Sequence, residues 1–269
     1  MSVLFIAVLF AVPAMAQQEP AERERDPRWR EFYKAEASGY RFETAGPKAD
    51  QLIMHPLPVM QWLSLNDFYG DVFVWTLNGR PEVVGSIFSR PLSTGDQRSV
   101  MHEFYSFSAL PVQAAGVQGK LFSLAQRTEA KRIPDAPTPV DSAVSRDLQA
   151  RALARQFSAH MDRQGERWEL RLLNQPLYRY EKTSKEVLGG ALFAFVGYVT
   201  DPEILLLIEA RHLESKPAWT YVAARFSNKS LWLRHKETEV WRYPSDPTAL
   251  DGQYYLSPAR AVGLGEGSP

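Results

Sequence analysis

The chain of 269 residues contains no cysteine, and this absence excludes several classes of protein at once. Disulfide bonds, thiolate metal sites, iron–sulfur clusters and cysteine nucleophiles are all ruled out. The protein is therefore held together by packing, for which its length is sufficient. An excess of charge of one sign is also missing, since 31 basic residues balance 31 acidic ones. No overall field attracts nucleic acid, so we expect no nucleic-acid partner.

Long apolar segments are missing as well, apart from the first residues of the chain. Residues 3–12 are wholly apolar and are followed by Ala14-Met15-Ala16. This pattern is typical of a secretory signal peptide at 1–16, cleaved after Ala16, and predicts an exported protein of the periplasm or the extracellular space. The longest later run, 191–199, has the length of a strand, so we expect no transmembrane anchor after cleavage.

Two segments, 70–84 and 190–206, share the pattern of one β-hairpin. Each has a glycine, a phenylalanine three residues later, a turn, and then Pro-Glu with two aliphatic residues. In the first hairpin Asn78-Gly79 predicts a type I′ turn, because both residues accept positive φ. The similarity continues into the next strands, which end in Phe-Ser at 107–108 and 226–227. It indicates two related β units, although exported β meanders in general share such residues.

The remaining pattern predicts an α+β protein dominated by antiparallel sheet, as two pseudo-repeated units or a barrel. A flexible leader at 17–26 precedes a single domain at 27–245, with halves at 50–125 and 166–243, and a disordered tail follows at 246–269. The proline-rich connector 132–141 leads into one long central helix at 143–163. The other predicted elements are a short helix at 27–37, an extended edge segment at 52–65, and strands at 99–108, 119–125, 168–172, 177–180, 219–226, 230–235 and 239–243.

Four polar side chains are weak candidates for catalysis. His102 and Glu103 are adjacent, but neighbours in a strand point to opposite faces, so they cannot serve one site without a bulge. Glu209 and Arg211 share a face at the end of an apolar run, where they either line a polar pocket or form a surface ion pair. The histidines have no metal-ligand spacing, so we predict no metal site. Nucleophile elbows, phosphate loops and dinucleotide fingerprints are absent or incomplete, and we predict no cofactor.

Aromatic residues make up 12% of the chain and suggest a ligand groove. Trp232 lies on a strand face with an arginine, and Trp241 shares a face with Tyr243, as in surfaces that stack on sugar rings. Arg179 is a further candidate for ligand binding. The alternative is cross-strand packing, for which aromatic residues are equally suited.

Four segments carry a resemblance to a known family. They are the first hairpin with Gly-Arg-Pro at 79–81, His-Glu-Phe at 102–104, Glu-Leu-Arg-Leu-Leu-Asn-Gln-Pro at 169–176, and the second hairpin with Thr-Asp-Pro-Glu at 200–203. In these motifs the chain resembles a family of uncharacterised exported proteins that is abundant in planctomycete genomes. The resemblance covers about residues 28–243, and it implies export and one shared fold, with no assigned activity and no catalytic residues to transfer.

These observations favour a non-catalytic exported protein that binds a small molecule, a glycan or a cell-envelope component. One alternative is an envelope hydrolase that uses carboxylates such as Glu103 and Glu209. A second alternative, a cofactor-binding split barrel, rests on the Asn-Gly-Arg-Pro hairpin alone. Convergence of His102, Glu103, Arg179, Glu209 and Arg211 in one pocket would favour the hydrolase.

Overall fold

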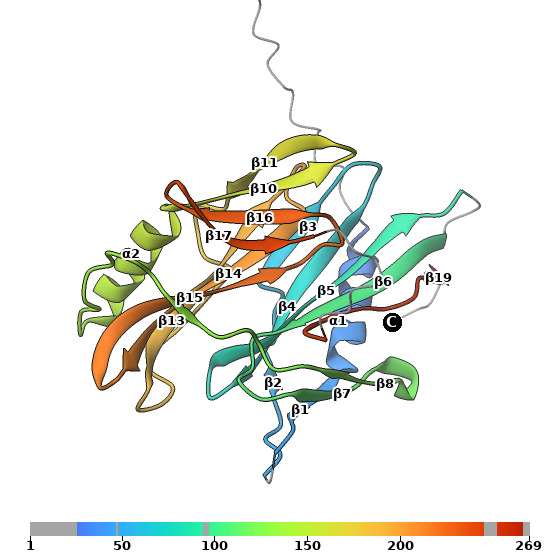
Figure 1. The fold of residues 1–269 in the computed structure, drawn as a ribbon. Helices are drawn as coiled ribbons and strands as arrows, with labels where there is room; N and C mark the ends of the chain where they lie inside the picture. The colour runs from blue at the N-terminus through green and yellow to red at the C-terminus, as the bar shows by residue number, and fades with distance from the viewer. Residues whose placement is uncertain (1–25, 47, 94–96, 245–251, 266–269) are drawn as a thin grey trace, which may run out of the picture.

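The computed structural model describes residues 26–46, 48–93, 97–244 and 252–265 (Figure 1). The predicted signal peptide and nearly all of the predicted leader lie outside these ranges. The described residues form mainly antiparallel sheet, as the sequence predicts, and they contain two short α-helices. Helix α1 (Pro27–Ser38) begins where the Asp26 carboxylate accepts the Arg28 N–H at 3.0 Å and Pro27 occupies the first turn. It buries Trp29, Tyr33 and Ala37.

The first large sheet is built on a three-stranded meander of β4, β5 and β6. Its turn at Asn78-Gly79 has positive φ at both residues, as the sequence predicts. The order is β18-β6-β5-β4-β2, with β19 also on β6 and β3 also on β4. The strands are β2 (Ile53–Met54), β3 (Met60–Leu63), β4 (Tyr69–Leu77), β5 (Arg80–Pro91), β6 (Gln97–Ser106), β18 (Tyr254–Leu256) and β19 (Arg260–Gly263).

The second large sheet contains a matching meander of β13, β14 and β15 and curls at one side through β10, β11, β16 and β17. Its order is β17-β16-β10-β11-β13-β14-β15-β9, with β12 also on β13. The strands are β9 (Lys131–Arg132), β10 (Phe157–Arg163), β11 (Glu166–Leu172), β12 (Tyr178–Tyr180), β13 (Val187–Val196), β14 (Pro202–Leu213), β15 (Lys216–Arg225), β16 (Leu231–His235) and β17 (Thr238–Tyr243).

The two large sheets pack face to face, and a helix covers the outer face of each. Val74, Val84, Leu205 and Leu207 lie in the shared inner core. On the outer side of the first sheet, α1 and the small sheet of β1 (Arg41–Thr44), β7 (Val112–Ala115) and β8 (Leu121–Leu124) enclose a second core. Helix α2 (Ala143–Ala154) covers the outer face of the second sheet, where it shares a third core with residues of β13 and β14 and of the curled strands β10 and β16. Because both faces of each sheet are covered, β4, β5 and β14 are buried along most of their length.

The two halves of the chain repeat one order of elements. Each begins with a helix that contacts the first two strands of its own meander, α1 on β4 and β5 and α2 on β13 and β14. The strand after each helix, β1 or β10, pairs with the first strand after the meander, β7 or β16. That strand then pairs with the next one, β8 or β17. A short strand borders the first meander strand in both halves, β3 on β4 and β12 on β13.

Two predictions about the ends of elements are wrong. The long helix predicted at 143–163 ends at Ala154, and residues 157–163 form β10. Phe157, Ala159 and Met161 are buried alternately, a strand period that also fits a helical stripe. The tail predicted at 246–269 is ordered in its described part, 252–265, because β18 and β19 satisfy backbone groups along β6.

Candidate functional site

Glu82 and Glu203 occupy β-bulges at corresponding places in the two meanders. The register passes from Trp75 opposite Val83 to Thr76 opposite Pro81, so that Glu82 is left without a cross-strand partner. The register of β13 and β14 shifts in the same way: Phe195 lies opposite Ile204 and Val196 lies opposite Pro202, so Glu203 has no cross-strand partner. A bulge reorients the side chain of the extra residue. Both glutamates are consequently buried, at 7% and 2% exposure.

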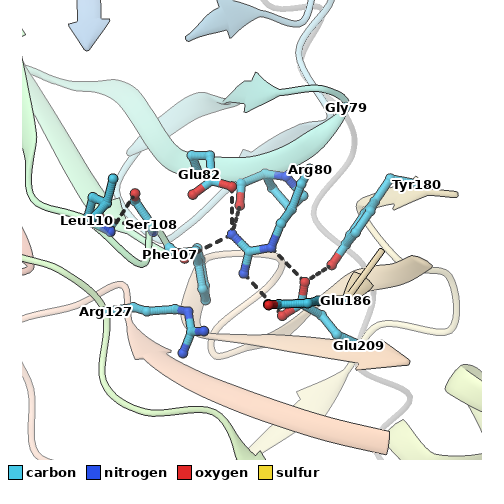
Figure 2. Close-up of polar contacts among 12 residues, drawn as sticks. Gly79, Arg80, Glu82, Phe107, Ser108, Leu110, Arg127, Tyr180, Glu186 and Glu209 are labelled. Atoms are coloured by element: carbon cyan, nitrogen blue, oxygen red, sulfur yellow. Dashed lines mark hydrogen bonds and ion pairs between the residues drawn. The ribbon is translucent and has the colours of Figure 1, made fainter. Parts of the chain in front are cut away.

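Beside Glu82, the Arg80 side chain fills the space between the two large sheets. We call the cluster of Arg80, Glu82, Tyr180 and Glu209 the closed seam (Figure 2). The Arg80 guanidinium donates from Nε to Glu209 Oε1 at 2.7 Å and from Nη2 to Glu209 Oε2 at 3.1 Å. Its Nη1 donates to Glu82 Oε1 at 2.8 Å. The Tyr180 hydroxyl donates to Glu209 Oε1 at 2.6 Å. Arg80 thus joins β5 of one sheet to β14 of the other.

The charges of the closed seam are fixed by this geometry. Burial alone would raise the pKa of the Glu209 carboxyl, but Arg80 and the Tyr180 hydroxyl lower it below its usual value. Burial raises the pKa of Glu82, against the opposing effect of Arg80. The guanidinium is therefore matched with a firmly ionised Glu209. No side-chain atom of these four residues is among the buried polar atoms left without a hydrogen-bond partner in the described residues, which favours a structural link between the sheets.

At Glu203 the corresponding region contains a cavity of about 260 Å³, which we call the open seam. A second cavity of about 250 Å³ adjoins it, and Phe68, Asp201, Glu203 and Lys229 line both. The remaining residues around the first cavity are Trp62, Phe88, Met101, Glu103, Phe226, Ser227, Asn228, Tyr254 and Leu256. The residues around this cavity come from both large sheets, from the loop before β4, from the turn between β13 and β14, and from the loop after β15.

Aromatic rings form one wall of the open seam. The ring centroids of Trp62, Phe68 and Phe88 lie 5.4–5.9 Å from one another in tilted arrangements. The Trp62 indole is held in place by donating from Nε1 to Ser86 Oγ at 2.9 Å. Such a wall can stack on a flat ring or face a cation.

Carboxyl groups also line the open seam. Lys229 Nζ forms an ion pair with Glu203 Oε1. Burial, together with the neighbouring Glu203, raises the pKa of Asp201 to about 7. Burial also raises the pKa of Glu103 well above its usual value, and the Tyr254 hydroxyl donates to Glu103 Oε2 at 2.8 Å. Lys229 therefore pairs with Glu203, while the raised pKa values of Asp201 and Glu103 mean that these two groups become negative only at higher pH than an exposed carboxyl group, so the negative charge of the cavity grows as the pH rises.

The five polar candidates do not converge in one pocket, although Glu209 and Arg211 are neighbours. Glu103 lines the open seam, whereas Glu209 belongs to the closed seam. Arg211 lies beside Glu209, with Nη1 3.8 Å from Oε2. His102 points to the opposite face of β6 from Glu103, where the Tyr40 hydroxyl lies 2.6 Å from its Nδ1 and Glu36 Oε2 lies 3.2 Å from its Nε2.

The aromatic candidates do not form one row. Trp232 stacks on His160 with ring centroids 4.8 Å apart, while Trp241 and Tyr243 pack against the core on the other face of the sheet. All three are half-buried, which matches the packing alternative better than an open groove. Arg179 lies elsewhere, with Nε 3.1 Å from Asp147 Oδ1 beside a further cavity under α2.

The sequence predicts Glu103 as a site candidate and marks Asp201 and Glu203 only as part of the Thr-Asp-Pro-Glu motif, and it gives no sign of Phe68, Lys229 or Tyr254. Lys229 lies in a loop without a motif, and Tyr254 belongs to the segment predicted to be disordered. The Pro-Glu pair repeated at 81–82 and 202–203 is the one signal that points to both seams.

No protein-family model matches this chain, and neither does any curated protein or any solved structure. The resemblance to exported planctomycete proteins therefore stays a prediction. Neither of the helices in the described ranges is long and apolar enough to cross a membrane. In the same ranges no three histidine, aspartate or glutamate side chains are placed to hold a metal ion.

Proposed function

We propose that this chain is an exported binding protein whose open seam holds a small organic cation. One observation carries the proposal: a cavity with an aromatic wall and buried carboxylates lies where the closed seam holds the Arg80 guanidinium. Aromatic faces and carboxylates are the two protein groups that stabilise a desolvated organic cation. The ligand class is thus a primary amine or a guanidine with a small apolar body.

The comparison of the seams depends on treating the two halves as pseudo-repeats. Glu82 corresponds to Glu203 through its bulge, and Tyr180 corresponds to Trp62, because they pair with Gly190 and Gly70. Glu209 lies six residues after Glu203, and Phe88 lies six residues after Glu82. The open seam therefore has an aromatic ring where the closed seam has its second carboxylate. This exchange favours a cation that carries an apolar group.

Lys229 supplies the cationic charge in the absence of a ligand. Its side chain is 35% exposed, whereas that of Glu203 is 2% exposed, so the lysine approaches the buried carboxylate from the solvent side. A long and partly exposed lysine can move into water at little cost. We therefore expect the ligand to displace Lys229 from Glu203 and to pair with the same carboxylate.

Calorimetric titration of the full chain with benzylammonium and with benzoate tests the proposal. The two probes match in size and differ in charge, so benzylammonium should bind and benzoate should not. Glu203→Gln should weaken benzylammonium binding at least about tenfold, since a charge-assisted hydrogen bond contributes roughly 1.5–3 kcal/mol. Glu82→Gln is the matched control, because it alters the corresponding carboxylate of the closed seam, and it should leave the affinity unchanged.

The pH dependence has a defined sign. Protonation of Asp201, whose pKa is about 7, removes negative charge from the cavity, so affinity should rise as the pH increases through that value. Equal binding of benzoate, or equal loss of affinity in Glu82→Gln and Glu203→Gln, would refute a cation site at the open seam.

One observation favours a hydrolase as the second candidate. Asp201 holds a proton near neutral pH while Glu203 lies beside it in the same cavity, a combination suited to general acid–base catalysis. The acid–base pair is then Asp201 and Glu203, and not the pair Glu103 and Glu209 that the sequence suggests, because Glu209 lies in the closed seam. Turnover of a chromogenic glycoside or ester that is lost in both Asp201→Asn and Glu203→Gln would favour the hydrolase over the binding protein.

A further inference from the structure

The cavity of about 250 Å³ that adjoins the open seam contains a cation that the open seam lacks. Arg163, at the end of β10, lines this second cavity and does not line the open seam. Trp62 and Phe88 line only the open seam, whereas Asp201 and Glu203 line both cavities. An aromatic wall, a pair of carboxyl groups and a guanidinium group therefore follow one another across the two cavities.

The Arg163 side chain is held by aromatic rings and has no acidic partner. Its guanidinium carbon lies 5.2 Å from the ring centroid of Trp168 and 5.1 Å from that of Tyr198. Within the part of the chain that the structure describes, the guanidinium forms no ion pair and donates no hydrogen bond. The side chain is half-buried, so a ligand in the cavity can reach it. The rings thus position the guanidinium and leave its N–H groups available to an anion.

Arg163 differs in this respect from Arg80 of the closed seam. The Arg80 guanidinium is paired inside the chain with two glutamates. Arg163 faces a cavity instead, and the planar fork of an arginine matches a carboxylate with two parallel hydrogen bonds. The second cavity is therefore suited to the carboxylate of a ligand whose cationic group lies at Glu203.

We propose that the ligand of the open seam is an α-amino acid with an apolar side chain, an inference that rests on the cation site proposed above. The apolar side chain lies against Trp62 and Phe88, the ammonium group pairs with Glu203, and the carboxylate accepts hydrogen bonds from Arg163. The order of the groups agrees, because the carbon that carries the ammonium group of an α-amino acid joins the side chain to the carboxylate. A plain amine would leave Arg163 without a partner.

Calorimetric titration of the full chain at pH 8, above the pKa of about 7 of Asp201, tests the proposal with three matched probes. Phenylalanine carries both charged groups, 2-phenylethylammonium lacks the carboxylate, and 3-phenylpropanoate lacks the ammonium group. The tighter-binding enantiomer of phenylalanine should bind at least about tenfold more tightly than 2-phenylethylammonium, the effect of one charge-assisted pair. 3-Phenylpropanoate should bind more weakly than either, because it leaves Glu203 without a cation from the ligand.

Two variants separate the role of Arg163 from a general effect of charge. Arg163→Met keeps the length of the side chain and removes the guanidinium, so phenylalanine should lose its advantage. The affinity of 2-phenylethylammonium should not fall in this variant, which also shows that the variant is folded. Arg242→Met is the matched control, because the Arg242 guanidinium also lies over a tryptophan, 5.3 Å from the ring centroid of Trp232, but outside both cavities. It should change no affinity.

The outcomes distinguish the amino-acid ligand from the cation site alone. If 2-phenylethylammonium binds and phenylalanine binds no more tightly, the cation site stands and the amino-acid ligand is refuted. A full preference for phenylalanine that persists in Arg163→Met also refutes the assignment of the carboxylate to Arg163. If neither phenylalanine nor 2-phenylethylammonium binds, the cation site and the amino-acid ligand are refuted together.

Discussion

Glu82 and Glu203 hold the same backbone position in two successive meanders. Each follows a proline, each is the extra residue of a bulge, and each carbonyl accepts a phenylalanine N–H, from Phe107 at 2.7 Å and Phe226 at 2.8 Å. The backbone is thus repeated, while the surroundings of the two side chains are not. One glutamate meets an arginine inside the fold, and the other borders a cavity.

Arg80→Ala should destabilise the protein strongly and in a way that can be chemically rescued. The change leaves Glu82 and Glu209 buried without their cation, which costs about 3–5 kcal/mol of unfolding free energy. It also opens a space of the size of a guanidinium group. Methylguanidinium at on the order of 10 mM should restore part of the melting temperature, because a ligand that binds only the folded state stabilises it.

The control for this rescue is Arg90→Ala, which removes an exposed arginine from the same strand. It should have little effect on the melting temperature, and methylguanidinium should not raise it. An Arg80→Ala protein that melts at the original temperature would show that the closed seam does not link the sheets.

The short-range features of the fold could be predicted from the sequence. Asp26-Pro27 predicts the start of α1 and Asn78-Gly79 predicts the turn of β4 and β5, because both depend on residues that are neighbours in the chain. The extent of α2 could not be predicted in this way. Residues 157–163 satisfy a helical stripe and a strand alternation equally, and pairing with β16 decides between them.

The candidate site depends on contacts that are distant in sequence. Neighbouring side chains of a strand point to opposite faces, and the structure places His102 and Glu103 on opposite faces of β6 as expected. Glu103 meets Tyr254 across a gap of 151 residues, and no local pattern specifies that pairing. The repeated Pro-Glu predicts two equivalent backbone positions. It does not predict that Arg80 closes one of them.

Asp201→Asn should stabilise the protein at neutral and higher pH. The folded-state pKa of about 7 is above the usual value of 3.8, so between these values the folded chain holds a proton that the unfolded chain has released. Stability contributed by this group therefore falls as the pH rises from about 4 to 7. Urea unfolding at pH 8 should give a gain of about 1–3 kcal/mol for the variant, and the gain should disappear near pH 4. An equal effect at both pH values would contradict a raised pKa.

Gly190→Ala should be far more harmful than Gly79→Ala, although both add one methyl group. A Cβ at position 190 would lie 2.5 Å from the Tyr180 hydroxyl and 2.6 Å from the Ile208 carbonyl oxygen, inside the meander. Relief of this overlap pushes Tyr180 away from Glu209 and should cost about 3 kcal/mol or more. At Gly79 nothing lies within 4 Å, so only the φ of +86° opposes a side chain, at about 1 kcal/mol. Urea unfolding of the two variants measures the difference, and equal losses would show that the Tyr180–Glu209 contact contributes little to stability.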